Sequence, residues 1–257
     1  MGEYLYNAGQ KRRYEAGEET KVWGRVPFDK AEVIEEAPYE FHPKFADKHF
    51  FTASDKAEFV PGVEAKMVDW FWANMEKGYL LWAPGEHHGF DWIVPPCEVG
   101  YEGSVEGSYE FDATKPIKIT RLGMQHYPYT DCYEHCWLSC FSDDPDDGFL
   151  IHMYEDCPGG IKWRTISVSS QKRMEGMKKM MEMAAKMAAE GKPMPPRPDI
   201  AGHMEYESGR LKDFLPQLYA LWVGHPDPFE NMQFDLTTAK NEDGTWRHVH
   251  KNLPPQR

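Results

Sequence analysis

The sequence predicts a single α+β domain, and three observations point to that fold class. A helix pattern occupies residues 64–78, strand-like segments follow one another from residue 101 to 170, and a run of good helix formers covers residues 171–191. Helix, antiparallel meander and long helix in that order are typical of α+β proteins. We therefore expect a curved antiparallel sheet packed against a helix, with a cavity between them.

Residues 1–60 predict an N-terminal arm that packs on this core. The segment is charged and aromatic, and prolines at positions 27, 38 and 43 interrupt any long element. Residues 61–257 are then expected to form one domain. It opens with the helix over residues 64–78, because Pro61 and Gly62 favour a helix start, apolar side chains recur at three- and four-residue steps, and Gly78 is a typical stop.

The middle of the chain predicts four or five antiparallel strands in succession. Alternating or aromatic-rich segments are found at residues 104–112, 115–122, 132–141, 148–155 and 161–169. The turn Cys157-Pro-Gly-Gly160 separates the last two and is a strong hairpin signal. The long helix ends at Gly191, and a proline-rich linker follows. A second helix is expected from His203 to Leu215, where Pro216 kinks or interrupts it.

Composition excludes several classes of partner. The formal charge is −13 and the pI is near 5.3, which disfavours nucleic acids and acidic lipid surfaces because both attract cationic proteins. No run approaches the roughly 18 apolar residues of a membrane span. The polar start of the chain lacks a signal-peptide pattern, so we expect a cytoplasmic protein.

Several familiar motifs are missing from the sequence. Five cysteines are present, but without the two close CxxC-type pairs of a zinc site, so reduced and half-buried thiols are expected. No GxSxG elbow, GxGxxG or P-loop occurs, which leaves acyl-serine chemistry and nucleotide cofactors without support.

Two short motifs offer metal-ligand chemistry. His203 and Glu207 are four residues apart in a predicted helix, so their side chains share one face and can bind one cation together. The same spacing also occurs as a plain surface hydrogen bond. His87 and His88 lie in a predicted loop at residues 83–92, where burying two imidazoles requires partners. One can serve as a metal ligand and the other as a proton donor; the alternative is a surface pair without a role.

Three glutamates share one side of the predicted strand that follows: Glu102, Glu106 and Glu110. Even spacing gives them a common face. If that face meets solvent, it is a solvated surface. If it meets the cavity, one glutamate completes a set of two histidines and two glutamates, which suits Zn²⁺, with Fe²⁺ or Mn²⁺ as alternatives.

The helix over residues 171–191 carries an apolar methionine stripe at three- and four-residue steps: Met174, Met177, Met180, Met181, Met183 and Met187. Core packing is the ordinary interpretation of such a stripe. The alternative is that part of it lines the cavity and adapts to a flat aromatic ligand.

Three segments together resemble one enzyme family. They are VDWFWANMEKGYLLWAPGEHHGFDW at residues 68–92, IHMYEDCPGGIKWRTISVS at 151–169, and HMEYESGRLKDFLPQLYALW at 203–222. In this order they resemble the aromatic helix and Y-x-L-W-x-P-x-x-H segment, the strand–turn–strand segment, and the HxxxE helix with FLPELY of the 2,4-diacetylphloroglucinol hydrolase and phloretin hydrolase family. Where many relatives have WHP, this chain has Trp82-Ala83-Pro84.

The resemblance implies a helix-grip (START-like) fold with a large cavity and a zinc ion bound by two histidines and two glutamates. Carried over by position, the ligands are His87, Glu110, His203 and Glu207; His88 stays open as the alternative to His87, and Glu106 as the alternative to Glu110. The implied catalytic residues are Tyr79 at the substrate phenols, His152 in the cavity, Asp91 after the loop, and His88.

The implied reaction is hydrolysis of the carbon–carbon bond between an acyl group and a phloroglucinol ring. The expected substrate is a small acylphloroglucinol, either phloretin or a relative such as 2,4-diacetylphloroglucinol, and the flexible methionine helix favours the longer arm of phloretin. The competing class is a non-catalytic binding protein for apolar aromatic ligands. The aromatic-rich arm suggests a homodimer.

Overall fold

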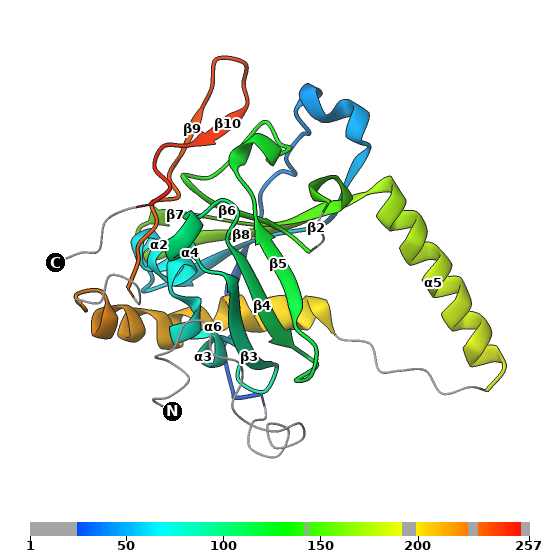
Figure 1. Ribbon diagram of the computed structural model, residues 1–257, viewed down its shortest axis with the longest axis horizontal. Coiled ribbons are helices and arrows are strands. Elements are labelled where there is room, and N and C mark those ends of the chain that lie inside the picture. The colour runs from blue at the N-terminus through cyan, green and yellow to red at the C-terminus, as the bar shows by residue number, and fades with distance from the viewer. Residues whose placement is uncertain (1–24, 142–143, 192–198, 226–230, 253–257) are drawn as a thin grey trace.

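The computed structural model describes residues 25–141, 144–191, 199–225 and 231–252. Its centre is an eight-stranded antiparallel sheet (Figure 1) in the order β1-β2-β8-β7-β6-β5-β4-β3. The strands are β1 (Glu32–Ile34), β2 (Phe50–Pro61), β3 (His87–Val94), β4 (Val105–Glu110), β5 (Ile117–Arg121), β6 (His135–Cys140), β7 (Gly148–Cys157) and β8 (Gly160–Ser170). The predicted α+β class and the antiparallel meander, here β4 to β8, are confirmed.

The helices surround this sheet unevenly. They are α2 (Ala65–Ala73), α3 (Tyr79–Trp82), α4 (Pro96–Val99), α5 (Gln171–Ala189) and α6 (Ile200–Trp222). The described residues also form the short 3₁₀ turns η2 (Pro43–Lys48), η3 (Met75–Lys77), η4 (Met124–His126) and η5 (Pro145–Asp147). A separate hairpin joins β9 (Thr238–Lys240) to β10 (Trp246–His248). In Figure 1, α6 crosses the sheet region whereas α5 projects away from it.

Both faces of the sheet are covered by apolar side chains. One face packs against α2, α3 and α6 through a cluster rich in tryptophan, which includes Trp70, Trp72, Trp137 and Trp163. The opposite face packs under the chain before β2 and the segment around Tyr127 and Tyr129. A sheet buried on both faces explains why several of its strands lack the clean polar alternation of a half-exposed sheet.

Strand β2 departs from the predicted irregular arm. Residues 50–61 form β2, which pairs along its length with β8, from Phe50 opposite Ser170 to Pro61 opposite Gly160. The charged residues Lys56 and Glu58 hide this strand in the sequence, but they form an ion pair with 2.6 Å between Lys56 Nζ and Glu58 Oε1. Pairing with β8 satisfies the backbone that an arm would leave to solvent.

Three further elements differ from the predicted ones. The helix predicted over residues 64–78 ends at Ala73 and is followed by the separate 3₁₀ turn η3. The predicted loop at residues 83–92 is shorter, because β3 begins at His87. The second helix does not end before Pro216 but runs through it to Trp222. Proline removes one backbone hydrogen bond there, and burial of Phe214, Leu215 and Leu218 on this helix offsets the loss. The linker at residues 192–198 lies outside the described residues.

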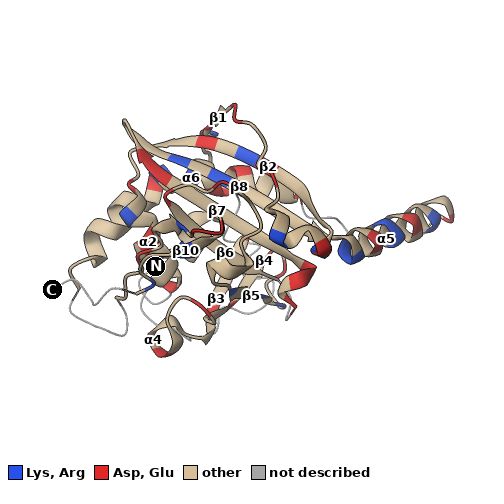
Figure 2. Ribbon diagram, turned by 90° about the horizontal axis from the view of Figure 1, so that it is seen from above, with Lys and Arg blue, Asp and Glu red and all other residues tan. Residues whose placement is uncertain are grey.

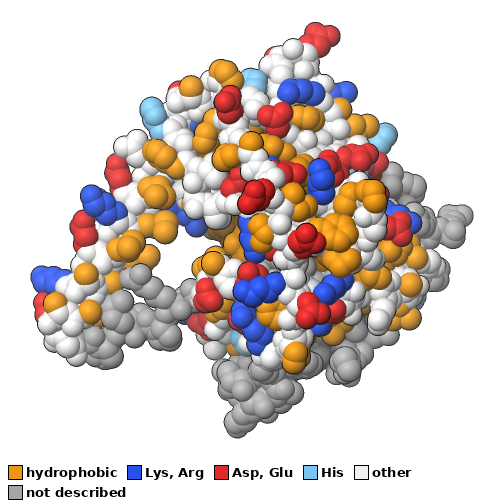
Figure 3. Space-filling model, turned by 180° about the vertical axis from the view of Figure 1, so that it is seen from behind, with side chains coloured by type: hydrophobic (Ala, Val, Ile, Leu, Met, Phe, Trp, Pro, Cys, Tyr) orange, Lys and Arg blue, Asp and Glu red, His pale blue; other side chains and the backbone are white. Residues whose placement is uncertain are grey.

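The methionine helix neither packs in the core nor lines the cavity. Five of its methionines, from Met174 to Met183, are 41% to 61% exposed, and the apolar stripe sits among charges along the projecting helix (Figures 2 and 3). Both interpretations of the stripe are therefore wrong. Periodicity shows that a helix is amphipathic but does not show what its apolar face meets. The start of α5 does reach the cavity, through Arg173.

Candidate metal centre

Three elements bring four predicted ligands together. His203 and Glu207 lie one turn apart on α6, whose first turn is capped by Asp199 accepting from the Gly202 N–H at 3.0 Å. His87 begins β3, and Glu110 ends β4 directly opposite it. A register shift between His87 and Gly89 marks a bulge at this point, and bulges re-aim side chains near the end of a ladder.

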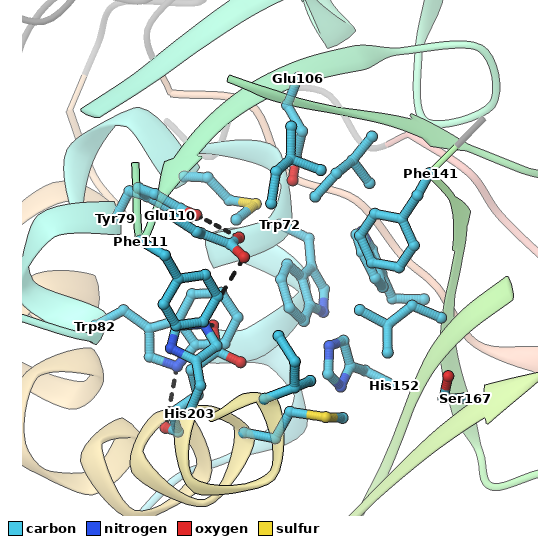
Figure 4. A pocket seen from close by; sticks show the side chains of 18 of the residues that line it. Trp72, Tyr79, Trp82, Glu106, Glu110, Phe111, Phe141, His152, Ser167 and His203 are labelled. Carbon is cyan, nitrogen blue, oxygen red and sulfur yellow. Dashed lines mark hydrogen bonds and ion pairs between the residues drawn. The ribbon is translucent and has the colours of Figure 1, made fainter. Parts of the chain in front are cut away.

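The four side chains converge on one point, and Figure 4 shows two of them, Glu110 and His203, facing each other. His87 Nε2 lies 3.2 Å from Glu207 Oε1, His203 Nε2 lies 3.5 Å from the same oxygen, and His203 Nε2 lies 3.8 Å from Glu110 Oε2. Donor atoms of His87, Glu110 and His203 all lie within 4.8 Å of one another. Two imidazoles and two carboxylates at these separations can surround one divalent cation.

The hydrogen bond made by His87 Nδ1 shows that the other ring nitrogen, Nε2, is the one free to bind a cation. Its Nδ1 lies 2.8 Å from the Tyr79 carbonyl oxygen, which only accepts hydrogen bonds, so Nδ1 carries the proton and Nε2 is a lone pair. Burial and the neighbouring His203 charge lower the pKa of His87 to about 3. Within the described part of the chain, Nε2 is buried without a hydrogen-bond partner, as expected of a metal ligand.

The surroundings of Glu207 and His203 raise the proton affinity of both side chains. Burial raises the pKa of Glu207 to about 7, against the lowering effect of His203. Burial alone would lower the pKa of His203, but the carboxylates of Glu207, Glu86 and Glu110 outweigh it and raise that pKa to about 9. A bound divalent cation would replace these protons.

A second layer of contacts orients the donors. His203 Nδ1 donates to Glu86 Oε2 at 2.7 Å, and Glu86 Oε1 lies 2.7 Å from Arg25 Nη2. Tyr79 contacts two of the candidate metal ligands, His87 and Glu110. Its carbonyl accepts a hydrogen bond from His87 Nδ1, its hydroxyl donates to Glu110 Oε1 at 2.6 Å, and its ring stacks on His87 with centroids 3.9 Å apart. Such outer contacts fix ring orientation and raise ligand basicity.

Phe111 lies next to Glu110 with a backbone φ of 56°, a left-handed conformation that costs a non-glycine residue of order 1 kcal/mol. Its ring packs edge-on against His203, with centroids 4.6 Å apart. The turn at the end of β4 therefore places an apolar cover over the donor cluster.

A cavity of about 420 Å³ opens in front of the cluster, within the size range of ligand pockets. Its aromatic and aliphatic lining includes Trp72, Trp82, Trp137, Phe141 and Ile119, and its polar lining includes Tyr79, Glu106, Glu110, His152, Ser167, Arg173, His203 and Glu207.

His152 lies in the middle of this cavity lining (Figure 4). Its ring stacks against Trp72 and Trp163, with centroids 5.5 and 4.8 Å away, and its Nδ1 lies 2.9 Å from Thr165 Oγ1. Burial lowers the pKa of His152 to about 3. The ring is therefore neutral near pH 7 and can exchange hydrogen bonds with a ligand without carrying charge.

Three of the sequence candidates lie apart from the donor cluster. Glu106 lines the cavity, but its Oε2 is ion-paired at 2.7 Å with buried Arg121. His88 is buried but is not among the donors that meet, because neighbouring residues of a strand point to opposite faces and His87 is the one directed at Glu207. Asp91 accepts a hydrogen bond from the Tyr109 hydroxyl at 3.1 Å and does not line the cavity. In the structure His87 and Glu110 belong to the donor cluster, whereas His88 and Glu106 do not.

Sequence reasoning missed the supporting residues Arg25, Glu86 and Phe111. Glu86 directly precedes His87, but nothing in its spacing signals that it contacts His203, which is 117 residues away. Arg25 lies in the segment predicted to be an arm. A left-handed Phe111 has no sequence signal at all, since glycine or asparagine is the usual choice there.

A second group of donors also meets in the structure. Asp69, His135 and Asp235 offer atoms within 4.8 Å of one another. Asp69 is already engaged, because His135 Nδ1 lies 3.0 Å from its Oδ2 and the Tyr154 hydroxyl donates to its Oδ1 at 2.6 Å. Internal hydrogen bonds therefore account for this cluster. The five cysteines are free thiols.

Comparisons with known proteins give no assignment. The chain matches no family model and no curated protein. Among solved structures it is similar to protein Ms6760 from Mycobacterium smegmatis, with a TM-score of 0.40, 9% sequence identity, and coverage of 71% of this chain and 96% of that one. A likeness this distant carries no argument about function. In the described parts of the chain, no helix has the length and apolar character needed to cross a membrane.

Proposed function

We propose that this protein is a metal-dependent hydrolase that cleaves the carbon–carbon bond between an acyl group and a phloroglucinol ring. The observation that carries the proposal is the buried, lone-pair Nε2 of His87 facing Glu207, with His203 and Glu110 beside it, at one end of an aromatic cavity. The resemblance of three sequence segments to acylphloroglucinol hydrolases supplies the substrate class. In this proposal the fold is a helix-grip arrangement in which the sheet encloses α6.

Zn²⁺ is the cation we propose for the four donors, with Fe²⁺ as the alternative. Two neutral imidazoles and two carboxylates form a borderline donor set that suits either ion. When bound, the cation supplies Lewis acidity, which polarises a carbonyl oxygen and activates a water near neutral pH.

The reaction adds water across one carbon–carbon bond. The hydroxyl of the water joins the acyl carbonyl carbon, the bond to the ring breaks, and the ring carbon keeps the electron pair and gains a proton. The products are a carboxylic acid and phloroglucinol. The ring carbon leaves readily only when protonated, since the dienone tautomer then departs as a stabilised enolate.

The side chains around the cavity divide this work. Trp72 and Trp137 line the cavity with flat faces for the substrate ring, and neutral His152 lies against both, where it can relay a proton between phenol and ring carbon. Tyr79 acts mainly as a positioning residue, because its hydroxyl proton is committed to Glu110. Burial and the charge of Glu110 raise the pKa of Tyr79, so the phenol keeps that proton.

Elemental analysis combined with a phloretin turnover assay tests the proposal. We expect one equivalent of metal per chain and release of phloroglucinol. Glu207→Gln should lose both metal and activity, whereas Glu205→Gln, on the same helix but paired with Lys30 and Lys56, should keep both. Full activity of the wild-type protein in a strong chelator would refute the metal-dependent mechanism.

The alternative is a non-catalytic binding protein for apolar aromatic ligands. The apolar share of the cavity lining favours it, because an aromatic chamber binds flat ligands without any chemistry. The same experiment separates the two functions: a plain binding protein would take up phloretin without stoichiometric metal and without forming phloroglucinol.

A further inference from the structure

The end of the cavity opposite the donor cluster has a different chemical character. Ser54 and Ser167 are direct cross-strand partners on β2 and β8, and both line the cavity. Arg173, in the first turn of α5 and six residues after Ser167 in the chain, also lines it. Figure 4 shows Ser167 on the far side of His152 from Glu110 and His203. The cavity therefore has carboxylates at one end and a cation with hydroxyls at the other.

Arg173 is the one lysine or arginine among the described residues that line this cavity. No carboxylate in the described ranges lies within ion-pair distance of its guanidinium, whereas buried Arg121 pairs with Glu106 and buried Arg164 with Asp55. Its position is fixed at the backbone, where its N–H donates to the Ser170 hydroxyl at 3.1 Å. A guanidinium presents a fork of donors that matches a carboxylate or phenolate oxygen.

The distance between the two ends selects a long ligand. Glu110 ends β4 and Ser167 lies on β8, four steps apart in the sheet order, and His152 on β7 lies between them in the cavity lining (Figure 4). A ligand that reaches both ends must therefore extend past His152, for which an acetyl group on a ring held at the donor cluster is too short. An arylpropanoyl arm extends much further toward Arg173.

We infer that Arg173, with Ser54 and Ser167, forms a subsite for an acceptor oxygen at the far end of the substrate's acyl arm. The ligand class is an acylphloroglucinol whose arm ends in a phenol or a carboxylate. The inference rests on the proposed function for the choice of ligand, but its test is a binding measurement that does not depend on turnover.

Tryptophan fluorescence provides the readout, because Trp72, Trp82 and Trp137 line the cavity. Zinc-loaded protein is titrated with phloretin, with its analogue lacking the hydroxyl on the arm, and with the analogue carrying a carboxylate there. The variants are Arg173→Gln and the control Lys172→Gln, which removes one positive charge from the same turn at an exposed residue outside the lining.

We expect wild-type protein to bind at least one oxygen-bearing arm about tenfold more tightly than the bare phenyl arm, as a hydrogen bond to a charged donor implies. The tighter binder of the two ligands with an oxygen on the arm shows whether the subsite prefers a phenol or a carboxylate. The preference should vanish in Arg173→Gln and persist in Lys172→Gln. Equal binding of all three ligands, a preference that survives Arg173→Gln, or no binding of any ligand would overturn the inference. Selective binding without turnover would uphold it and refute the hydrolase.

Discussion

Replacing Glu86 tests whether the outer contacts of the donor cluster serve a metal. The carboxylate of Glu86 lies 2.7 Å from His203 Nδ1 and also contacts Arg25. Loss of such a partner typically costs 10- to 100-fold in metal affinity. Glu86→Gln keeps an acceptor oxygen for the His203 N–H, and Arg25 already neutralises part of the lost charge. We therefore expect the smaller effect, about tenfold or 1.4 kcal/mol.

Glu86→Ala removes the acceptor as well, so its zinc dissociation constant should rise toward 100-fold above that of the wild type. The measurement is a competition titration against a chromogenic chelator at fixed pH. Glu205→Gln is the matched control, since its carboxylate lies on α6 but binds Lys30 and Lys56 instead. Equal zinc affinity in the wild type and both Glu86 variants would show that this pairing does not support a metal site.

Three more outcomes follow from the structure. Glu207, with a pKa of about 7, and His203, with a pKa of about 9, must each lose a proton to bind metal. A plot of the logarithm of zinc affinity against pH should therefore have a slope near 2 below pH 7 and near 1 from pH 7 to 9, and should level off above pH 9. Calorimetry in several buffers measures the released protons. A pH-independent affinity would contradict this. The pKa of His152 falls from 6.5 to about 3 on folding, so the unfolded chain binds this proton more readily than the folded one. The free energy of unfolding of the wild type should therefore decrease as pH falls below 6.5, by about 2 kcal/mol at pH 5 through this residue. Urea unfolding of His152→Leu should lack that decrease. Gly78→Ala should destabilise the fold by about 1–3 kcal/mol, because its Cβ would lie 2.5 Å from Leu218 Cδ2; an unchanged urea midpoint would contradict that packing.

The sequence predicts the parts of the site that depend on local spacing. His203 and Glu207 share a helix face because of their four-residue separation, and this holds whatever surrounds the helix. The hairpin at Cys157–Gly160 is equally local. The choice between His87 and His88 is not, because it depends on a bulge where β3 meets β4. Asp91 illustrates the same limit: its register in β3, which the sequence does not reveal, directs it to Tyr109.

The errors in the fold have one physical origin. The charges of Lys56 and Glu58 make β2 look irregular in the sequence, although the two side chains pair with each other along one side of the strand. The methionine stripe of α5 looks like core because periodicity reports amphipathicity alone. In both cases a long-range partner, present or missing, decides the outcome. Glu86 and Arg25 follow the same rule, since neither pairs within its own segment.

The pairing of β2 with β8 has a consequence for synthesis of the chain. β2 leaves the ribosome well before β8, because the partner of Pro61 is Gly160, which is made roughly 100 residues later. This contact therefore raises the contact order and slows folding. Until then, the nascent chain exposes an unpaired edge, a known template for aggregation. Charged side chains on an edge strand disfavour pairing with other chains. Lys56 and Glu58 therefore protect the unpaired edge of β2 from aggregation before β8 is made.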